Sequence, residues 1–201
     1  MIDHTVVART RLGEKVSGDS YAVVPSKDGV LIAVVDALGH GVEASHIAET
    51  VIRTVRAQAD DEWIASIMWA CHEALIGTRG AVLALAFFNG KHNTLTWMGV
   101  GNVHGILLRA GGGQTPKTRH MVQRSGVVGD RVPGLTAEVL HVAPRDCMVF
   151  ATDGVAPSFD ESVCADEAPQ TIAHKIMDNY SVRGDDALTL VARYLGPDGK
   201  P

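Results

Sequence analysis

The sequence predicts an α+β fold in which mainly antiparallel β-sheets form a sandwich with helices layered outside. Strand-like runs open the chain, two consecutive amphipathic helical segments follow them, and a second series of strand-like runs precedes one further helix and a last strand. This order lacks the strand-helix alternation of a parallel doubly wound sheet. It therefore favours antiparallel sheets.

The N-terminal half is expected to contain three strands and then two helices. The strand segments are rich in Val and Ile, and Lys27-Asp28-Gly29 is typical of a hairpin turn between the second and the third. In the helical segments that follow, apolar residues such as Ile47, Val51 and Val55 recur at helical spacing. The expected strands are residues 2 to 10, 20 to 25 and 29 to 36, and the expected helices are residues 42 to 59 and 61 to 76.

The C-terminal half is expected to return to strands. A single domain is predicted over residues 1–195, followed by a frayed tail at residues 196–201. Residues 111 to 117 and 124 to 135 are rich in Gly or in turn residues and are expected to be loops. The expected strands are residues 80 to 88, 94 to 100, 103 to 109, 136 to 142, 147 to 152 and 187 to 194, and the expected helix is residues 167 to 180.

Composition excludes several classes of protein. The chain has 201 residues, 46% of them hydrophobic and 20% charged, which is typical of one well-cored globular domain and excludes intrinsic disorder. A net charge of -5 and a pI near 6.0 argue against nucleic acid or an anionic membrane as the main partner. Cys71, Cys147 and Cys164 form no CxxC pattern, and neither a signal peptide nor a long apolar run is present. We expect a soluble, cytoplasmic protein.

Four aspartates lie beside strand ends or turns: Asp19, Asp36, Asp153 and Asp186. Asp36 and Asp153 end apolar runs that are typical of buried strands, where an ionised carboxylate is costly unless it is paired or bound to a metal. Carboxylates converging from several strand ends would form a site for a hard cation such as Mg²⁺ or Mn²⁺. The alternative is that Asp36 caps the following helix and that Asp153 and Asp186 only form turns.

The local sequences around these aspartates resemble the motifs of one protein family, and they occur in the same order along the chain. VVDALGHG, ATDGV and DALTLV resemble the DGxGHG, TDG and closing D-x-x-T segments of the metal-dependent protein phosphatases (PPM, protein phosphatase 2C-like). SGDSY resembles the early GD segment of the bacterial branch that includes the SpoIIE and RsbX phosphatases, and the short chain is most similar to the RsbX type. VGVGNVHGILLR and SGVVGDRVPGL resemble further family segments. The resemblance covers residues 17 to 192.

The resemblance implies a four-layer αββα sandwich that binds two Mn²⁺ or Mg²⁺ ions between its sheets. Asp36 would bridge both metals, and the backbone carbonyl of Ala37 would bind one of them. Asp153 and Asp186 would hold the other metal, and Asp19 would orient metal-bound waters. Because the family usually has Gly at the position of Ala37, the backbone geometry there is in question.

Other residues are weaker site candidates. Asp186 is preferred over Asp185 as a ligand because it stands three residues before Thr189, as in the family pattern. Gly154 belongs to the TDG segment, and His40 in the DALGHG turn could approach a metal-bound water. The residue that binds phosphate is unknown; the basic candidates near Asp19 are Arg9, Arg11 and Lys15. Ala187 also departs from the family, which usually has Asn or Asp there.

By this resemblance the protein is expected to be a protein serine/threonine phosphatase in which a metal-activated water attacks phosphorus directly. Its expected partners are phosphorylated STAS-domain proteins of a stressosome. Ala37 and Ala187 motivate an alternative, a non-catalytic adaptor of the same fold that binds phosphoproteins. A third reading takes GHGVEA at residues 39–44 as a dinucleotide-binding turn, but the acids at residues 60–62 fall between two expected helices rather than after a strand.

The three tryptophans are expected to lie in the core or on a sheet face, and helical spacing supports this for the first two. These residues are Trp63, Trp69 and Trp97. The GGGQTPKT segment at residues 111–118 superficially resembles a phosphate-binding loop, but Pro116 stands where a glycine is needed. A hairpin loop is expected there.

Overall fold

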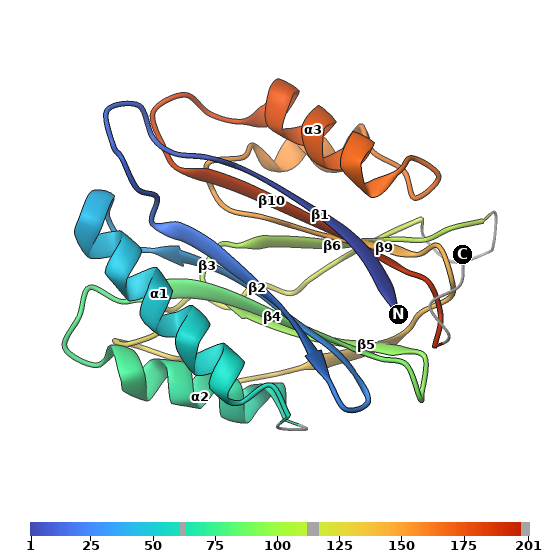
Figure 1. Ribbon diagram of the computed structural model, residues 1–201, viewed down its shortest axis with the longest axis horizontal. Helices are drawn as coiled ribbons and strands as arrows, with labels where there is room; N and C mark the ends of the chain where they lie inside the picture. The colour runs from blue at the N-terminus through green and yellow to red at the C-terminus, as the bar shows by residue number, and fades with distance from the viewer. Residues whose placement is uncertain (61–62, 112–116, 198–201) are drawn as a thin grey trace.

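A computed structural model describes residues 1–60, 63–111 and 117–197. Within this part of the chain, ten strands form two five-stranded antiparallel sheets, and helices cover both outer faces (Figure 1). The strands are β1 Ile2–Arg9, β2 Asp19–Ser26, β3 Gly29–Ala37, β4 Ala81–Asn89, β5 Thr94–Val100, β6 His104–Leu108, β7 Thr118–His120, β8 Glu138–His141, β9 Cys147–Ala151 and β10 Ala187–Tyr194. The helices are α1 Gly41–Ala57, α2 Ile64–Leu75, the short 3-10 helix η1 Pro157–Glu161 and α3 Pro169–Tyr180.

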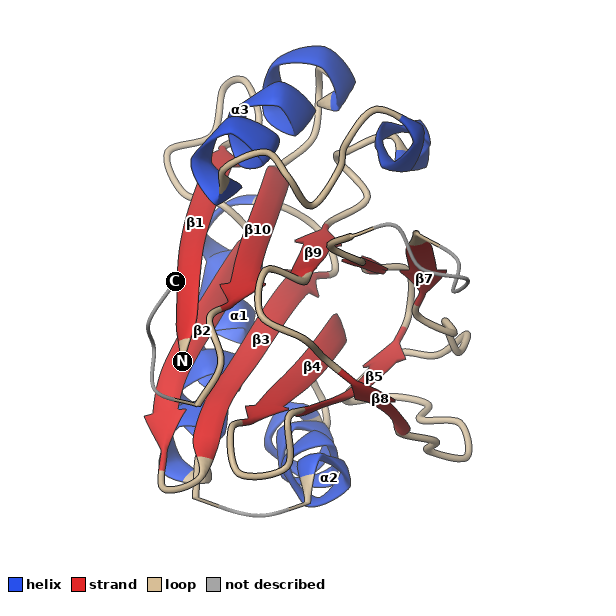
Figure 2. Ribbon diagram, turned by 90° about the vertical axis from the view of Figure 1, so that its right-hand side faces the viewer, coloured by secondary structure: helices blue, strands red, loops and turns tan. Residues whose placement is uncertain are grey.

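The sheets have the orders β1-β10-β9-β6-β7, called here the β10 sheet, and β2-β3-β4-β5-β8, called the β3 sheet. Figure 2 shows the strands between α3 on one side and α2 on the other. α1 and α2 cover the outer face of the β3 sheet, and α3 covers that of the β10 sheet. The predicted α+β sandwich is confirmed.

Alternation along the strands gives three apolar layers. In β3, Leu31, Ala33 and Val35 face α1 and α2, whereas Ile32 and Val34 face the other sheet. In β10, Leu188 and Leu190 also face the space between the sheets. Because side chains alternate with a period of two, each strand contributes to an outer and a central layer. This alternation also fixes where the polar ends of the strands point.

Several expectations are corrected. β7 and η1 were not predicted, because β7 has three residues and η1 only five. Trp97 is buried, but Trp63 and Trp69 are 72% and 47% exposed, so the prediction that they lie in the core is wrong. Much of the GGGQTPKT segment and of the predicted frayed tail, namely residues 112–116 and 198–201, lies outside the described residues.

The turn before α1 does not fit a dinucleotide-binding unit. α1 is followed by α2, and β3 pairs only with the antiparallel strands β2 and β4. The parallel strand that such a unit requires therefore does not follow α1. Among the described residues, no helix has the length and apolar character needed to cross a membrane.

Candidate active site

The carboxylates predicted from the sequence lie where the strands end, on the inner faces of the sheets. Asp36 continues the face of Ile32 and Val34, and Asp186 precedes Leu188 on the central face of β10. Asp19 lies directly opposite Asp36 in the pairing of β2 with β3. The same period of two that buries the central apolar layer thus aims these carboxylates into the space between the sheets.

Asp19 is buried and is held by the opposite sheet. Its Oδ2 accepts a 2.6 Å hydrogen bond from Thr152 Oγ1, and its backbone N–H donates to Ser17 Oγ at 3.0 Å. Thr152 Oγ1 in turn accepts a 2.9 Å bond from the backbone N–H of Leu188. Thr152 therefore links β2 to β9 and β10, and its position fixes the distance between the two sheets at the site.

Asp186 organises the segment that precedes β2. Its Oδ1 accepts a hydrogen bond from the backbone N–H of Arg11, and its Oδ2 accepts one from Gly18, both at 2.8 Å. A carboxylate has about four acceptor positions, so two remain for another ligand. Asp185 is exposed, and its Oδ1 accepts the 3.0 Å hydrogen bond of the Asp186 N–H.

Asp153 is exposed on the turn after β9, and its Oδ2 accepts a 2.9 Å hydrogen bond from Asn102 Nδ2. Gly154 allows the backbone of the neighbouring strand to come close. A Cβ there would lie 1.8 Å from the carbonyl oxygen of Asp186, so only glycine fits without a backbone shift. Gly154 thus brings the turn of Asp153 against the segment of Asp186.

These side chains line one open cleft of about 490 Å³. Among the described residues that line it, five are aspartates and none is Lys or Arg. The lining residues that carry the argument are Asp19, Asp36, Asn102, Asp153, Asp185 and Asp186.

The crowding of carboxylates changes their acidity. Burial raises the pKa of Asp36 to about 8, and the negative charges of Asp19, Asp153 and Asp185 add to the effect. Burial also raises the pKa of Asp19 to about 7, with the charges of Asp186, Asp153 and Asp185 adding and the Thr152 hydrogen bond opposing. Without a bound cation, the cleft therefore retains protons near neutral pH.

The segment after Asp36 explains how alanine replaces the usual glycine. Ala37 is fully buried and still belongs to β3, where its N–H donates to the Gly18 carbonyl at 3.1 Å. The positive φ values in this turn occur at Gly39 and Gly41 instead. A side chain at position 37 therefore requires no unusual backbone conformation.

The prediction that Asp36 caps the following helix is wrong. α1 has His40 at its N-cap and no side-chain cap bond. His40 does not line the cleft; its Nδ1 lies 2.6 Å from Glu14 Oε1. His40 therefore connects the start of α1 to the segment before β2.

The basic candidates near Asp19 also lie outside the cleft lining. Arg9 donates to Ser181 Oγ at 2.7 Å, Arg11 contributes its backbone N–H to Asp186, and Lys15 is exposed. Arg79 was not predicted, but its guanidinium packs over Gly39 at the cleft and forms a 2.9 Å ion pair with Glu43. Arg79 is thus a positive charge at the rim.

Sequence reasoning missed two partners of the aspartates, Asn102 and Thr152. Both belong to motifs that were recognised, because Asn102 follows Gly101 in the GN segment and Thr152 precedes Asp153 in ATDGV. Their hydrogen bonds to Asp153 and Asp19 span 51 and 133 residues, so only the folded structure identifies them.

The donor set of the cleft fits divalent cations. Hard carboxylate oxygens are the ligands that Mg²⁺ and Mn²⁺ prefer, and the raised pKa values of Asp19 and Asp36 reflect negative charge that a cation would neutralise.

The fold and the sequence place the chain in a known family. The profile of the family described as "Stage II sporulation protein E (SpoIIE)" matches residues 26–194, and the chain belongs to this family. A curated relative, "Phosphoserine phosphatase RsbX" of Bacillus subtilis (strain 168), is 30% identical over 95 residues. That match covers 47% of this chain and 47% of the relative, so it spans about half of each.

Solved structures share the fold over nearly the whole chain. A chain of the structure described as "The bacterial stressosome: a modular system that has been adapted to control secondary messenger signaling" has 26% identity and a TM-score of 0.83, with 96% of this chain and 100% of that chain covered. RsbX in complex with magnesium has 21% identity and a TM-score of 0.84, with 96% and 94% covered. At 21% identity, the likeness to RsbX shows the fold alone.

Proposed function

We propose that this chain is a metal-dependent protein serine/threonine phosphatase that hydrolyses phosphoserine and phosphothreonine. The observation that carries the proposal is the convergence of five aspartates in one open cleft whose described lining contains no cationic side chain. Membership of the SpoIIE family and the partial match to a phosphoserine phosphatase support the same reaction.

The proposed ligand set uses the strand ends. Asp36 would bridge two Mn²⁺ or Mg²⁺ ions, the Ala37 carbonyl would bind one of them, and Asp153 and Asp186 would hold the other. When bound, two such ions would supply a coordinated water of lowered pKa and polarisation of the phosphoryl oxygens, which is the chemistry that direct hydrolysis near neutral pH requires. The side chains that line the cleft would then position the ions, the water and the phosphoryl group.

Each supporting side chain has a distinct part in this arrangement. Thr152 holds Asp19 at 2.6 Å, so that Asp19 can orient water on the inner side of the cleft. Asn102 holds Asp153 at 2.9 Å and limits its rotation. Asp186 ties the backbone of residues 11 and 18 to the site. Thr152 and Asn102 lie outside the proposed ligand set, and partners of this kind commonly change metal affinity or activity by about 10–100-fold.

The reaction is tested by hydrolysis of p-nitrophenyl phosphate with Mn²⁺, with Mg²⁺ and with chelator. We expect turnover only with metal, and a loss of at least about 10²-fold in Asp153→Asn. Metal-independent turnover, or full activity in the variant, would contradict the proposed ligand set. Metal binding without hydrolysis of this compound or of any phosphopeptide would favour the adaptor alternative.

We also propose that the substrates are phosphorylated STAS-domain proteins of a stressosome and that the enzyme acts in the cytoplasm. The partial match to RsbX and the likeness to a chain from a stressosome study support this assignment. The test is the rate of phosphate release from a phosphorylated STAS domain, compared with a phosphopeptide of the same local sequence. A higher kcat/KM for the folded domain is expected; equal values would argue against recognition of the domain.

A further inference from the structure

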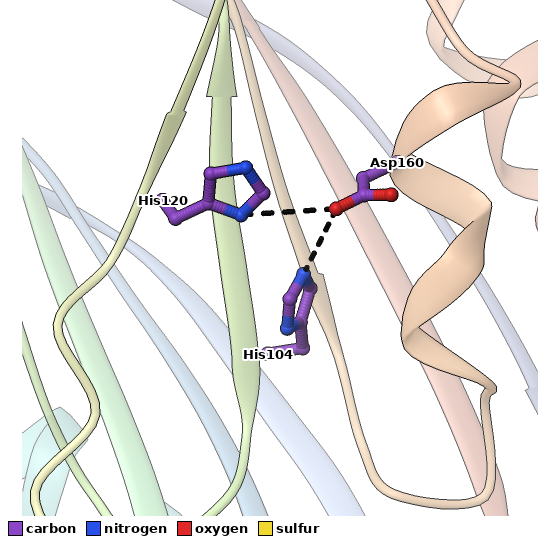
Figure 3. A group of neighbouring side chains, drawn as sticks. All are labelled: His104, His120 and Asp160. Carbon is purple, nitrogen blue, oxygen red and sulfur yellow. Dashed lines mark ion pairs between the residues drawn. The ribbon is translucent and has the colours of Figure 1, made fainter.

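A second group of metal-ligating side chains lies outside the carboxylate cleft. His104 at the start of β6, His120 in β7 and Asp160 in η1 each offer one ligand atom, and these atoms lie within 4.8 Å of one another (Figure 3). His104 Nε2 is 4.0 Å and His120 Nδ1 is 3.8 Å from the same oxygen, Asp160 Oδ2. The cluster thus joins three segments that are far apart in the sequence.

This group faces away from the active-site cleft. His104 shares the face of Ile106 and Leu108, which pack beneath α3 and η1 on the outer side of the β10 sheet. His104 pairs with Ala151 where β6 and β9 lie side by side. Asn102 and Asp153, which line the cleft, come just before His104 and just after Ala151 in the chain. The two groups of ligands therefore lie on opposite faces of one sheet.

The three side chains point at one another but form no hydrogen bonds with one another. Both separations from Asp160 Oδ2 exceed the length of a hydrogen bond. His104 Nε2 is buried and has no hydrogen-bond partner within the described part of the chain. A buried nitrogen without a partner destabilises the folded state, so this arrangement calls for a further group that contacts His104 Nε2.

The spacing leaves room for an ion between the ligands. Zinc-ligand bonds of about 2.0–2.1 Å in a tetrahedron place neighbouring ligand atoms about 3.3 Å apart, so small side-chain movements would close the site. His120 is 54% exposed and lies on the edge strand β7, where such a movement is easily accommodated. Phe159 packs edge-on against the His104 ring, with centroids 5.3 Å apart, and fixes its orientation.

The protonation state of His104 also favours the binding of a cation. Burial lowers the pKa of His104, and the nearby charge of Asp160 only partly opposes this effect. The imidazole is therefore held toward its neutral form, which is the form that binds metals.

We propose that His104, His120 and Asp160 form a second metal site for a borderline transition-metal ion, with Zn²⁺ as the natural occupant. Two imidazole nitrogens and one carboxylate oxygen suit Zn²⁺ better than Mg²⁺, and the fourth position is left to water or to an external ligand. The ion would fasten η1 to β6 and β7 of the β10 sheet. The assignment is independent of the proposed phosphatase reaction.

The test is titration with Co²⁺, whose visible absorption reports low-coordinate binding by nitrogen and oxygen ligands. It is made in Asp36→Asn, and in parallel in the wild-type protein saturated with Mg²⁺, so that Co²⁺ binding in the carboxylate cleft is reduced, and His120→Ala in the same background reports what the cleft still contributes. We expect one equivalent of Co²⁺ that Zn²⁺ displaces. His120→Ala and Asp160→Asn should each weaken this binding at least tenfold.

His174→Ala is the matched control, because His174 is an exposed histidine on the neighbouring helix α3. It should bind Co²⁺ like the parent protein. Zn²⁺ should also raise the melting temperature of the parent and of His174→Ala but not of His120→Ala. Absence of Co²⁺ binding, or equal binding in His120→Ala and the parent, would overturn the proposal and leave an ordered water as the partner of His104.

Discussion

Asp36 and Asp19 lie opposite each other in the pairing of β2 with β3, and this pairing places a partly buried and a buried carboxylate side by side with like charges around them. Such an arrangement is unfavourable for the fold unless protons or cations compensate for the charge. Both residues were predicted from their positions beside strand ends or turns and from the family segments that VVDALGHG and SGDSY resemble. Thr152, which bonds Asp19, could not be predicted because that contact depends on how the two sheets pack. Asn102, which bonds Asp153, could not be predicted because that contact depends on the pairing of β6 with β9.

The raised pKa values predict how the metal-free protein responds to pH. Asp36 has a pKa of about 8 in the folded state, against about 4 in an unfolded chain, so the folded state binds more protons between these values. The free energy of unfolding should fall as pH rises from about 4 to 8. Urea unfolding in chelator at pH 5 and pH 8 measures this.

The matched variant for this prediction is Asp36→Asn, which is neutral at both pH values. Its stability should fall less between pH 5 and pH 8, with the remaining slope due mainly to Asp19. A metal-free wild type that becomes more stable toward pH 8 would contradict the electrostatic description of the cleft.

The neighbouring residues Asp185 and Asp186 make different contacts, and their variants should differ accordingly. Asp186→Asn should weaken metal binding and also lower the melting temperature, because it perturbs the bonds to the Arg11 and Gly18 N–H groups. Asp185→Asn, at an exposed position, should leave the melting temperature of the metal-free protein within about 1–2 °C. Calorimetry with Mn²⁺ and thermal unfolding in chelator separate the two effects. If Asp185→Asn alone abolishes metal binding, the ligand role belongs to Asp185.

Arg79 offers a test of substrate contact at the rim. If its guanidinium attracts the phosphate as it enters the cleft, Arg79→Ala should raise KM for a phosphopeptide a few-fold with little change in kcat. Lys15→Ala, which removes an exposed charge outside the cleft lining, is the control. An unchanged KM in Arg79→Ala would exclude this role.

At the scale of the elements, the turns between strands and helices decide where the site residues lie. Periodicity predicted the long elements because each buries one or both faces, but β7 and η1 are too short to show a period. The misplaced Trp63 and Trp69 have a related cause. Trp63 precedes the first turn of α2, and Trp69 lies edge-on against His72 on the exposed side of that helix.

Gly154 provides the element-scale prediction. Gly154→Ala should destabilise the protein by about 1–3 kcal/mol or more, because its Cβ would meet the Asp186 carbonyl oxygen at 1.8 Å. Gly134→Ala is the control, since a Cβ there meets no atom within 4 Å. Urea unfolding of both variants measures the difference. Equal stabilities would show that the turn can move away from the segment of Asp186 without cost.

At the scale of the whole molecule, a central apolar layer holds two sheets together and leaves their carboxylate-bearing ends apart as a cleft. The order of the elements was sufficient to predict the sandwich, because it excludes parallel βαβ units. The pairing of β2 with β3 follows from the predicted hairpin turn, but the pairing of β1 with β10 is not determined by local patterns. They bring Asp19 and Asp186, from opposite ends of the chain, into one site.

The most direct test of the central claim is phosphate release from a phosphoserine peptide with Mn²⁺, for the wild type, Asp36→Asn and Asp28→Asn. Asp28 is exposed in the turn at the other end of the β2-β3 hairpin, so its variant controls for loss of a charge. We expect metal-dependent release by the wild type and Asp28→Asn, and a loss of at least about 10²-fold in Asp36→Asn. Release by Asp36→Asn at the wild-type rate would contradict a metal-dependent reaction in this cleft.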